Sequence, residues 1–188
     1  MFVLRRPSQA QIQHFIASQR DSSYSYPEVG ATRLRAPLHY QVDHNRAPLG
    51  RGIATFESAK RGIRQWRMFA ISWLTLHALD APIEPGTTVA VVSSHFGFWA
   101  LNACRIVYVI DEPECYGFAY GTVPAHAEIG EERFTVEFHS ADESVWYDIY
   151  AFSRPRPLIR LANPLARRLQ KRFAQDSMAA MRQAVEAS

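Results

Sequence analysis

The feature that most constrains the fold is a pair of alternating segments in the second half of the chain. Residues 132–138 (ERFTVEF) and 144–152 (SVWYDIYAF) place apolar and polar side chains at alternate positions, and a short polar turn separates them. Alternation with a period of two is typical of β-strands that turn one face toward a core. The two segments therefore predict an antiparallel hairpin, and pairing Phe138 with Val145 sets its register.

This register assigns each side chain to a face of the hairpin. One face carries Phe134, Val136, Tyr147 and Ile149, and the other carries Arg133, Thr135, Glu137, Trp146, Asp148 and Tyr150. Arg133 is expected to reach Asp148 across the strands. By parity Glu132 points to the apolar face, where a carboxylate needs a partner or a solvated cavity because an unpaired buried charge is costly. A Glu132 that simply lies in water at the end of its strand is the open alternative.

A second hairpin is expected just before this one. Residues 104–110 (CRIVYVI) and 115–121 (CYGFAYG) are rich in β-branched and aromatic side chains, and the polar stretch 111–114 contains a proline suited to a turn. If Ile110 faces Cys115, this register places Cys104 opposite Gly121. The two cysteines then do not face each other, and two free thiols are expected.

The same register places Arg105 opposite Tyr120. A guanidinium on an otherwise apolar strand can receive a carboxylate or phosphate group of a ligand. It can equally form an ion pair with Glu132 or another acid. Both interpretations stay open.

Helices are expected at both ends of the chain. Ser8 and Gln11 form a capping-box pattern that predicts a helix to about residue 19. Asn163 followed by Pro164 starts a long C-terminal helix without an internal helix breaker. Between these ends the pattern predicts a strand over 38–43, a turn-rich loop over 45–52, a helix over 56–69 capped by Thr55, a strand or continued helix over 72–79, a strand over 87–92 and a connector over 153–157.

Composition limits the class of protein. A chain of 188 residues with 47% hydrophobic residues and no long linker predicts a single domain, 1–188. Four tryptophans, eight tyrosines and eleven phenylalanines indicate a thick core or a cavity lined with rings. No apolar run approaches the roughly 20 residues that span a bilayer, and the start, MFVLRRPSQ, is not a secretory signal. We therefore expect a cytoplasmic location and no transmembrane segment.

Three motifs carry a resemblance to a known family. They are FGFWALNACRIVYVIDEPE (96–114), GFAYGTVPAHAEIGEERFTV (117–136) and YDIYAFSRP (147–155). They resemble a bacterial and plant family catalogued as domain of unknown function nineteen-ninety, and the similarity covers about residues 26 to 181. This family has no established activity, so the resemblance implies no catalytic residues.

The order of elements is also similar to that of the START-like helix-grip superfamily. That superfamily includes pollen allergens, polyketide cyclases and lipid-transfer domains. The similarity implies an α+β fold in which an antiparallel sheet wraps around a long C-terminal helix and leaves an apolar cavity between them.

The loop that follows the predicted strand over 115–121 carries the candidate catalytic and metal-binding residues. His126 and Glu128 could supply a base and an acid, or two metal ligands, on a loop beside Glu131 and Glu132. The candidate catalytic residues are His126, Glu128 and Glu132. No third ligand is fixed by spacing, so no metal and no cofactor are predicted, and a surface hydrogen-bonding cluster is the favoured alternative. Glu131, Glu132 and Arg133 can also clamp the loop. The candidate ligand-binding residues are Trp99, Arg105, Tyr120, His126, Glu131, Glu132 and Arg133, although Trp99, like Trp66, also fits a core position.

Three classes of function remain open. The favoured one is binding of a small hydrophobic or amphipathic molecule in the cavity. The second is a small-molecule hydrolase or cyclase that uses His126 and a nearby glutamate, although Ser93-Ser94-His95 lacks the glycine-flanked nucleophile of hydrolases. The third is binding of nucleic acid or an anionic surface through basic residues at 60–67 and 154–172. Nucleic acid is the less favoured partner, and a homodimer is left open.

Overall fold

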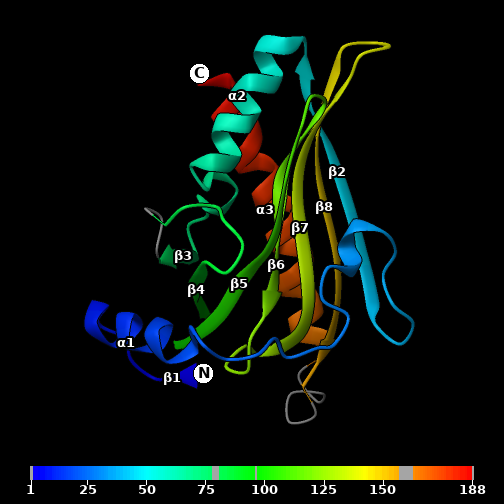
Figure 1. Ribbon diagram of the computed structural model, residues 1–188. Helices are drawn as coiled ribbons and strands as arrows, with labels where there is room; N and C mark the ends of the chain where they lie inside the picture. Colours follow the sequence, from blue (N-terminus) through cyan, green and yellow to red (C-terminus); the bar gives the residue numbers. More distant parts are fainter. Residues whose placement is uncertain (1, 78–80, 96, 157–162, 188) are drawn as a thin grey trace.

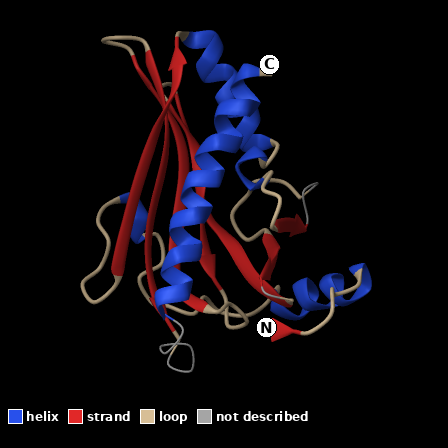
Figure 2. Cartoon of the chain, turned by 180° about the vertical axis from the view of Figure 1, so that it is seen from behind, coloured by secondary structure: helices blue, strands red, loops and turns tan. Residues whose placement is uncertain are grey.

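A curved antiparallel sheet wraps around a long C-terminal helix (Figures 1 and 2). The computed structural model describes residues 2–77, 81–95, 97–156 and 163–187. The strands are β1 (Phe2–Val3), β2 (Gln41–Arg51), β3 (Leu74–His77), β4 (Thr88–His95), β5 (Phe98–Glu112), β6 (Cys115–Thr122), β7 (Glu128–His139) and β8 (Ser144–Pro155). The helices are α1 (Gln9–Gln19), α2 (Ile53–Arg64) and α3 (Asn163–Glu186), with short 3-10 turns η1 (Ala31–Arg33) and η2 (Arg67–Phe69).

The strands follow the order β2-β8-β7-β6-β5-β4-β3, and β1 adds to the end of β5. Each neighbouring pair is antiparallel. Helix α3 crosses the inner, concave face of this sheet, as the view from behind shows (Figure 2). The expected α+β helix-grip architecture is therefore confirmed.

The helices at the two ends of the chain form as their sequence signals predict. At α1 the Ser8 hydroxyl accepts from the Gln11 N–H at 3.3 Å, and the Gln11 side chain accepts from the Ser8 N–H at 2.8 Å. These bonds satisfy two backbone donors that a helix start otherwise leaves free. Helix α3 begins at Asn163 and continues for 24 residues. None of the described helices is long and apolar enough to cross a membrane.

The hairpin of β7 and β8 has the predicted register. Phe138 faces Val145, and the side chains assigned to the apolar face are buried in the main core. On the outer face, Arg133 contacts Asp148 at 3.0 Å as expected. Strict alternation gave the correct result here because one face is fully buried, so a slip of one residue would expose the whole apolar set.

The hairpin of β5 and β6 exists, but its predicted register is wrong. Glu112 faces Cys115, because both strands continue to a tight turn at Pro113 and Glu114. A register shift between Ile106 and Tyr108 then moves the pairing back by one residue, as a β-bulge does. Both cysteines are free, as predicted.

The segment from 38 to 52 also differs from the prediction. One strand, β2, runs through the predicted loop over 45–52. Pro48 is tolerated because β2 is an edge strand that pairs with β8, with a register shift between Pro48 and Gly50. Helix α2 then starts after Gly52 rather than at Thr55.

Three further boundaries differ from the predicted ones. Helix α2 stops before Trp66, whose φ of 56° is left-handed, so the predicted helix over 56–69 is too long. The segment predicted as strand or helix over 72–79 is the strand β3, although residues 78–79 lie outside the described residues. The expected connector over 153–157 is strand to Pro155, and residue 157 lies outside the described part.

The main core fills the part of the space between the sheet and α3 that α2 and η2 cover. Its largest fully buried side chains include Phe56, Trp66, Phe118, Phe134 and Tyr147, and Met181 packs against them from α3. A second cluster joins α1 to the outer face of β4 and β5 through Ile12, Phe15, Ala90, Val92, Leu101 and Ala103. Because α2 and η2 cover one half of the inner face, the first half of α3 faces the remaining half of the sheet directly.

Candidate functional site

The first half of α3 and the inner face of the sheet line a half-open cavity of about 550 Å³. This volume lies within the range of roughly 300–1,000 Å³ that is usual for small-molecule sites. Most of the wall is apolar. The apolar lining includes Phe69, Leu74, Val91, Ile149, Ala151, Leu165, Leu169, Phe173 and Ala174.

Tyr120 and Glu132 form a polar pair in this wall. They face each other on neighbouring strands, and the Tyr120 hydroxyl donates to Oε2 of Glu132 at 2.8 Å. Burial raises the pKa of Glu132 to about 7, and the nearby carboxylates of Glu128 and Asp43 add to the rise, whereas the bond from Tyr120 opposes it. A carboxyl group with this pKa gains and loses its proton near neutral pH.

Gln170 connects α3 to the start of β7. Its amide nitrogen donates to both oxygens of Glu128, at 2.7 and 2.6 Å, and lies 3.2 Å from the Ser153 hydroxyl. Burial raises the pKa of Glu128, while the bond from Gln170 and the charge of Arg167 lower it. Glu128 is therefore held in place by the helix.

Arg167 and Asp43 make a second connection, between α3 and the edge strand β2. Both terminal nitrogens of Arg167 donate to the Asp43 carboxylate, one of them at 2.6 Å to Oδ1. Such a bidentate pair is among the stronger ion pairs because it is both charged and directional. The pair closes the polar end of the cavity on the side of β2.

His126 lines the cavity in its neutral form. Its Nδ1 accepts the backbone N–H of Glu128 at 2.9 Å, which places the proton on Nε2. Burial lowers its pKa to about 4. Because Nδ1 is occupied, it is poorly placed to take a proton from a substrate or to bind a metal. Nor do the described residues contain three His, Cys, Asp or Glu side chains close enough to hold a metal ion.

The structure brings four of the predicted site residues together at the cavity: Tyr120, His126, Glu128 and Glu132. Glu131 adjoins the cavity, but its carboxylate accepts hydrogen bonds from the Tyr26 hydroxyl, the Gly30 N–H, and the N–H and hydroxyl of Thr32. Glu131 thus clamps the segment before β2 onto the outer face, which agrees with the structural alternative for this loop.

Arg133 and Arg105 lie on the outer face, away from the cavity. Arg133 donates to the Thr32 carbonyl at 3.0 Å in addition to its ion pair with Asp148. Arg105 faces Gly121 instead of Tyr120, because the turn pairs Glu112 with Cys115 and the register shift in β5 then moves the pairing back by one residue. The expectation that Arg105 lies beside Tyr120 is therefore wrong.

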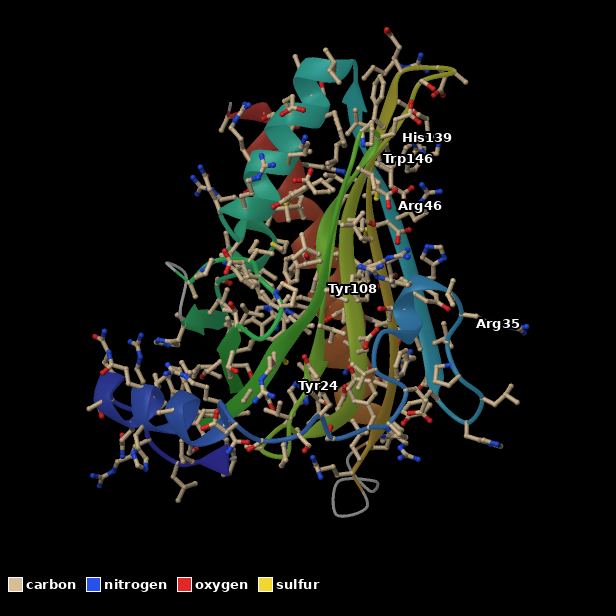
Figure 3. The ribbon with its side chains drawn as sticks, in the orientation of Figure 1. Tyr24, Arg35, Arg46, Tyr108, His139 and Trp146 are labelled. Carbon is tan, nitrogen blue, oxygen red and sulfur yellow. The ribbon has the colours of Figure 1, made fainter. Side chains whose placement is uncertain are left out.

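The guanidinium of Arg105 is occupied by the end of α1. It donates to the carbonyls of Ser22, Gln19 and Arg20 and to the Thr88 hydroxyl. A cation at a helix C-terminus satisfies carbonyls that the helix leaves free. Tyr24, whose ring lies under Arg105, and Tyr108 mark this outer face in Figure 3.

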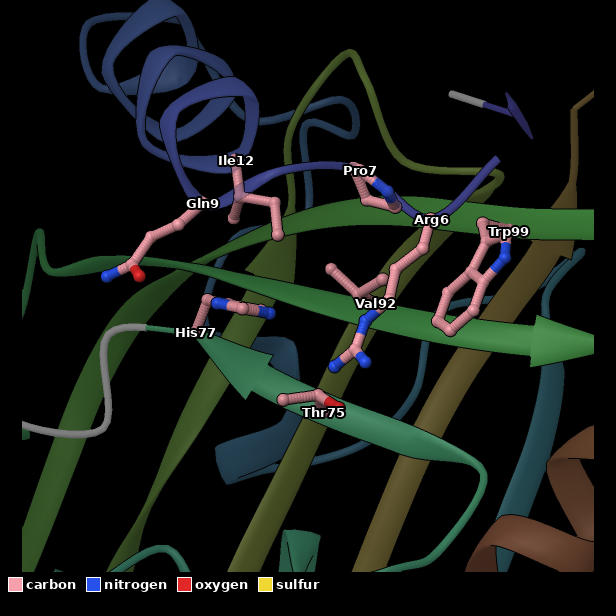
Figure 4. Close-up of a pocket in the computed structure, with 8 residues that line it drawn as sticks. All are labelled: Arg6, Pro7, Gln9, Ile12, Thr75, His77, Val92 and Trp99. Carbon is pink, nitrogen blue, oxygen red and sulfur yellow. The ribbon is translucent and has the colours of Figure 1, made fainter. Parts of the chain in front are cut away.

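Trp99 lines a different and smaller pocket, of about 240 Å³, beside α1 (Figure 4). The guanidinium of Arg6 lies 5.5 Å from the centre of its ring. Thr75 and His77 form the opposite wall, and burial lowers the pKa of His77, with a smaller contribution from Arg6. This pocket is below the usual size of a ligand site.

The cavity residues that sequence reasoning missed include Asp43, Asn102, Gln170 and Phe173. Gln170 and Phe173 carried a usable signal, because they fall among the inward positions of α3 beside Leu169. Asp43 alternates with Asn45 and Ala47, which would mark the inner face once β2 is read as one strand. Asn102 carried no signal, and its side chain accepts the Ala127 N–H at 3.1 Å.

Comparison with known proteins places the chain in a family. Residues 25–180 match the family described as Domain of unknown function (DUF1990). A UPF0548 protein of Deinococcus radiodurans is 38% identical over 186 residues, which cover 93% of this chain and 93% of that protein. A UPF0548 protein of Dictyostelium discoideum is 31% identical over 98% of this chain and 96% of its own length. The chain therefore belongs to the DUF1990 family.

The fold resembles that of solved proteins that are distant in sequence. The crystal structure of Ara h 8.0201 aligns with a TM-score of 0.55 over 79% of this chain and 99% of that chain, at 13% identity. An identity this low supports the fold alone. The fold is the START-like helix-grip fold that the order of elements predicted.

Proposed function

We propose that this member of the DUF1990 family binds one small hydrophobic or amphipathic molecule between the sheet and α3. The observation that carries the proposal is the cavity of about 550 Å³, with an apolar wall and a few polar groups gathered around Glu132. Protein interiors are close-packed and contain few voids larger than a water molecule. A cavity of this size and composition is instead typical of a ligand site, in which polar groups orient an apolar molecule.

The proposal is tested first by native mass spectrometry of freshly purified protein against its denatured mass. A retained non-covalent molecule with an apolar body would support it. The second measurement is the binding of an uncharged, environment-sensitive apolar dye, such as N-phenyl-1-naphthylamine, to the wild type and to two variants in which an alanine is replaced by phenylalanine.

The two variants add the same phenyl ring at different places. Ala151→Phe fills the cavity, because Ala151 lines it opposite Glu132. Ala179→Phe adds the ring to the exposed side of α3. We expect dye affinity to fall at least about tenfold in Ala151→Phe and to stay unchanged in Ala179→Phe, with both variants folded. Equal dye binding by the wild type and Ala151→Phe would refute the cavity as the binding site.

A second candidate is a small-molecule hydrolase or cyclase that uses the same cavity. The observation that favours it is Glu132, whose pKa is raised to about 7, a value suited to a general acid or base near neutral pH. The acid–base group would then be Glu132 and not His126, whose pKa is lowered to about 4. If a substrate is found, Glu132→Gln should remove the titration near pH 7 from the pH–rate profile. If the pH–rate profile of Glu132→Gln kept the titration near pH 7, Glu132 would not be the acid–base group.

A further inference from the structure

The polar end of the cavity carries more negative than positive charge. Glu128 and Glu132 lie on β7 and Asp43 lies opposite on β2, and each of Glu128 and Asp43 is close enough to raise the pKa of Glu132. The cation that reaches this cluster is Arg167, and its two terminal nitrogens are bound to Asp43. At most one of the three negative charges is therefore balanced by this guanidinium.

Glu132 has an oxygen without a donor. Among the described residues its carboxylate receives one hydrogen bond, which the Tyr120 hydroxyl donates to Oε2. Oε1 receives no hydrogen bond from these residues, and the half-buried side chain lines the cavity, where water or a bound molecule can reach this oxygen. A carboxylate oxygen that opens into a cavity can accept a hydrogen bond from a donor of a bound molecule.

The neighbours of Glu132 do not supply a compensating cation. Cys104 on β5, Tyr120 on β6 and Tyr147 on β8 are neutral groups whose own pKa values are raised by burial and by the charge of Glu132. Glu128 and Asp43 are carboxylates, His126 is neutral, and Arg167 acts on Glu128 rather than on Glu132. Lys171 also lines the cavity, but it is exposed on α3.

We propose that the ligand of this cavity is an amphipathic amine, whose protonated ammonium group donates to Oε1 of Glu132 and lies between Glu132 and Glu128. The inference rests on the proposed ligand-binding function and names the chemical class of the ligand. An ammonium group has up to three donors and no acceptor, which matches an oxygen that lacks a donor and a cluster that lacks a cation. The apolar body would lie along Ile149, Leu169 and Phe173.

The same geometry disfavours the two other common kinds of polar head. A carboxylate head would add a like charge beside Glu128 and Asp43, which is repelled at short range in a poorly solvated site. A hydroxyl head could donate one neutral hydrogen bond to Oε1, but such a bond is weaker than a charge-assisted one. We therefore expect the order of affinity to be amine, then alcohol, then acid.

The direct test uses three probes that differ only in the head group: dodecylamine, dodecanol and dodecanoic acid. Their affinities are measured at pH 7.5, below their aggregation concentrations, by displacement of the bound dye. The wild type is expected to bind the amine about tenfold or more tightly than the alcohol, and the acid least tightly.

Two glutamine variants of the same strand localise the effect. Glu132→Gln removes the charge and is expected to bring the amine to the affinity of the alcohol, while alcohol binding changes little. Glu137→Gln is the matched control, because Glu137 lies on the outer face of β7 and pairs with Arg46. It should leave all three affinities as in the wild type.

The possible results separate this inference from the proposed function. If the alcohol or the acid binds as tightly as the amine, or if Glu132→Gln keeps the preference for the amine, the inference fails and cavity binding stands. If none of the three probes binds in a way that Ala151→Phe abolishes, the proposed function fails and the inference with it. The inference is supported only by an amine preference that disappears in Glu132→Gln and persists in Glu137→Gln.

Discussion

Two cavity residues, Glu132 and His126, should make opposite contributions to stability as pH changes. Burial raises the pKa of Glu132 from 4.5 to about 7 and lowers that of His126 from 6.5 to about 4. Between about pH 4.5 and 6.5 the unfolded chain carries a charged glutamate and a charged histidine, whereas both groups are neutral in the folded protein. Folding therefore moves one proton from the histidine to the glutamate without changing the number bound.

The sign and size of each contribution follow from these values. Glu132 has a raised pKa, so its contribution is complete below pH 4.5 and is lost as pH rises through about 7. His126 has a lowered pKa, so its contribution is complete above pH 6.5 and is lost as pH falls through about 4. One pKa unit corresponds to about 1.4 kcal/mol, so each contribution amounts to about 3 kcal/mol. Between about pH 4.5 and 6.5 the effects of the two groups on the unfolding free energy change with pH in opposite directions and cancel.

Removal of either group should reveal how the other group changes the unfolding free energy with pH. Relative to the wild type, Glu132→Gln should gain about 2 kcal/mol of unfolding free energy as pH rises from about 5 to 6.5. His126→Asn, whose side-chain oxygen can still accept the Glu128 N–H, should lose about 2 kcal/mol over the same range. Glu128 also has a raised pKa, but it is present in all three proteins and its contribution cancels in the differences.

The assay is urea unfolding followed by tryptophan fluorescence at several pH values between about 5 and 6.5. The quantity compared is the difference in unfolding free energy between variant and wild type, with Glu57→Gln, at an exposed glutamate that pairs with Lys60, as the control that should show no pH-dependent difference. A difference between Glu132→Gln and the wild type that is constant over this range would refute the reasoning. It would mean that Glu132 already ionises in the folded protein at its ordinary pKa.

Three further predictions concern how the elements are held together. Glu131→Ala leaves the donors of Tyr26, Gly30 and Thr32 without an acceptor and should lower the unfolding free energy by about 3–5 kcal/mol. Urea unfolding measures this loss, and faster hydrogen exchange at the Gly30 and Thr32 amides would show that the loss arises at this segment. Asp43→Asn replaces the bidentate ion pair with Arg167 and should cost about 1–2 kcal/mol by the same assay, without a change in the fold by circular dichroism; an unchanged midpoint would show that the pair contributes nothing. Gly121→Ala would place a methyl group 2.0 Å from the Tyr26 hydroxyl, so we expect a loss of more than about 2 kcal/mol that Tyr26→Phe partly restores, and a neutral effect would contradict the packing.

The β7–β8 hairpin and the C-terminal helix could be predicted because local pattern and tertiary structure agree there. Strict alternation fixed the face of each side chain from Phe134 to Ile149, and it placed Glu132 on the inner face. The long helix lacks a breaker after Pro164. In both cases a different register or element would expose a complete apolar face, and no such alternative competes.

The failures lie where one residue changes the geometry. The bulge near Val107 moved Arg105 to the outer face, and nothing in the composition of β5 marks Val107 as an extra residue without a partner on β6. Pro48 and the nearby glycines signalled a loop, but an edge strand tolerates them. Gln170 reaches Glu128 across 42 positions of sequence, a contact that depends on how α3 lies over the sheet.

Glu131 and Glu132 are neighbours in sequence, and their contrast shows what a structural carboxylate requires in this fold. Glu131 faces the outer segment and accepts hydrogen bonds from three residues. Asp148, on the outer face of β8, contacts His44, Arg46 and Arg133. Both acids are buried and their oxygens are well supplied with donors, as stable packing demands. Glu132, one residue along from Glu131, has one hydrogen bond, two like charges and an open cavity beside it. A ligand of the proposed kind would complete the hydrogen bonding of Glu132 and balance its charge, which are the two things that the protein supplies to Glu131 and Asp148 itself.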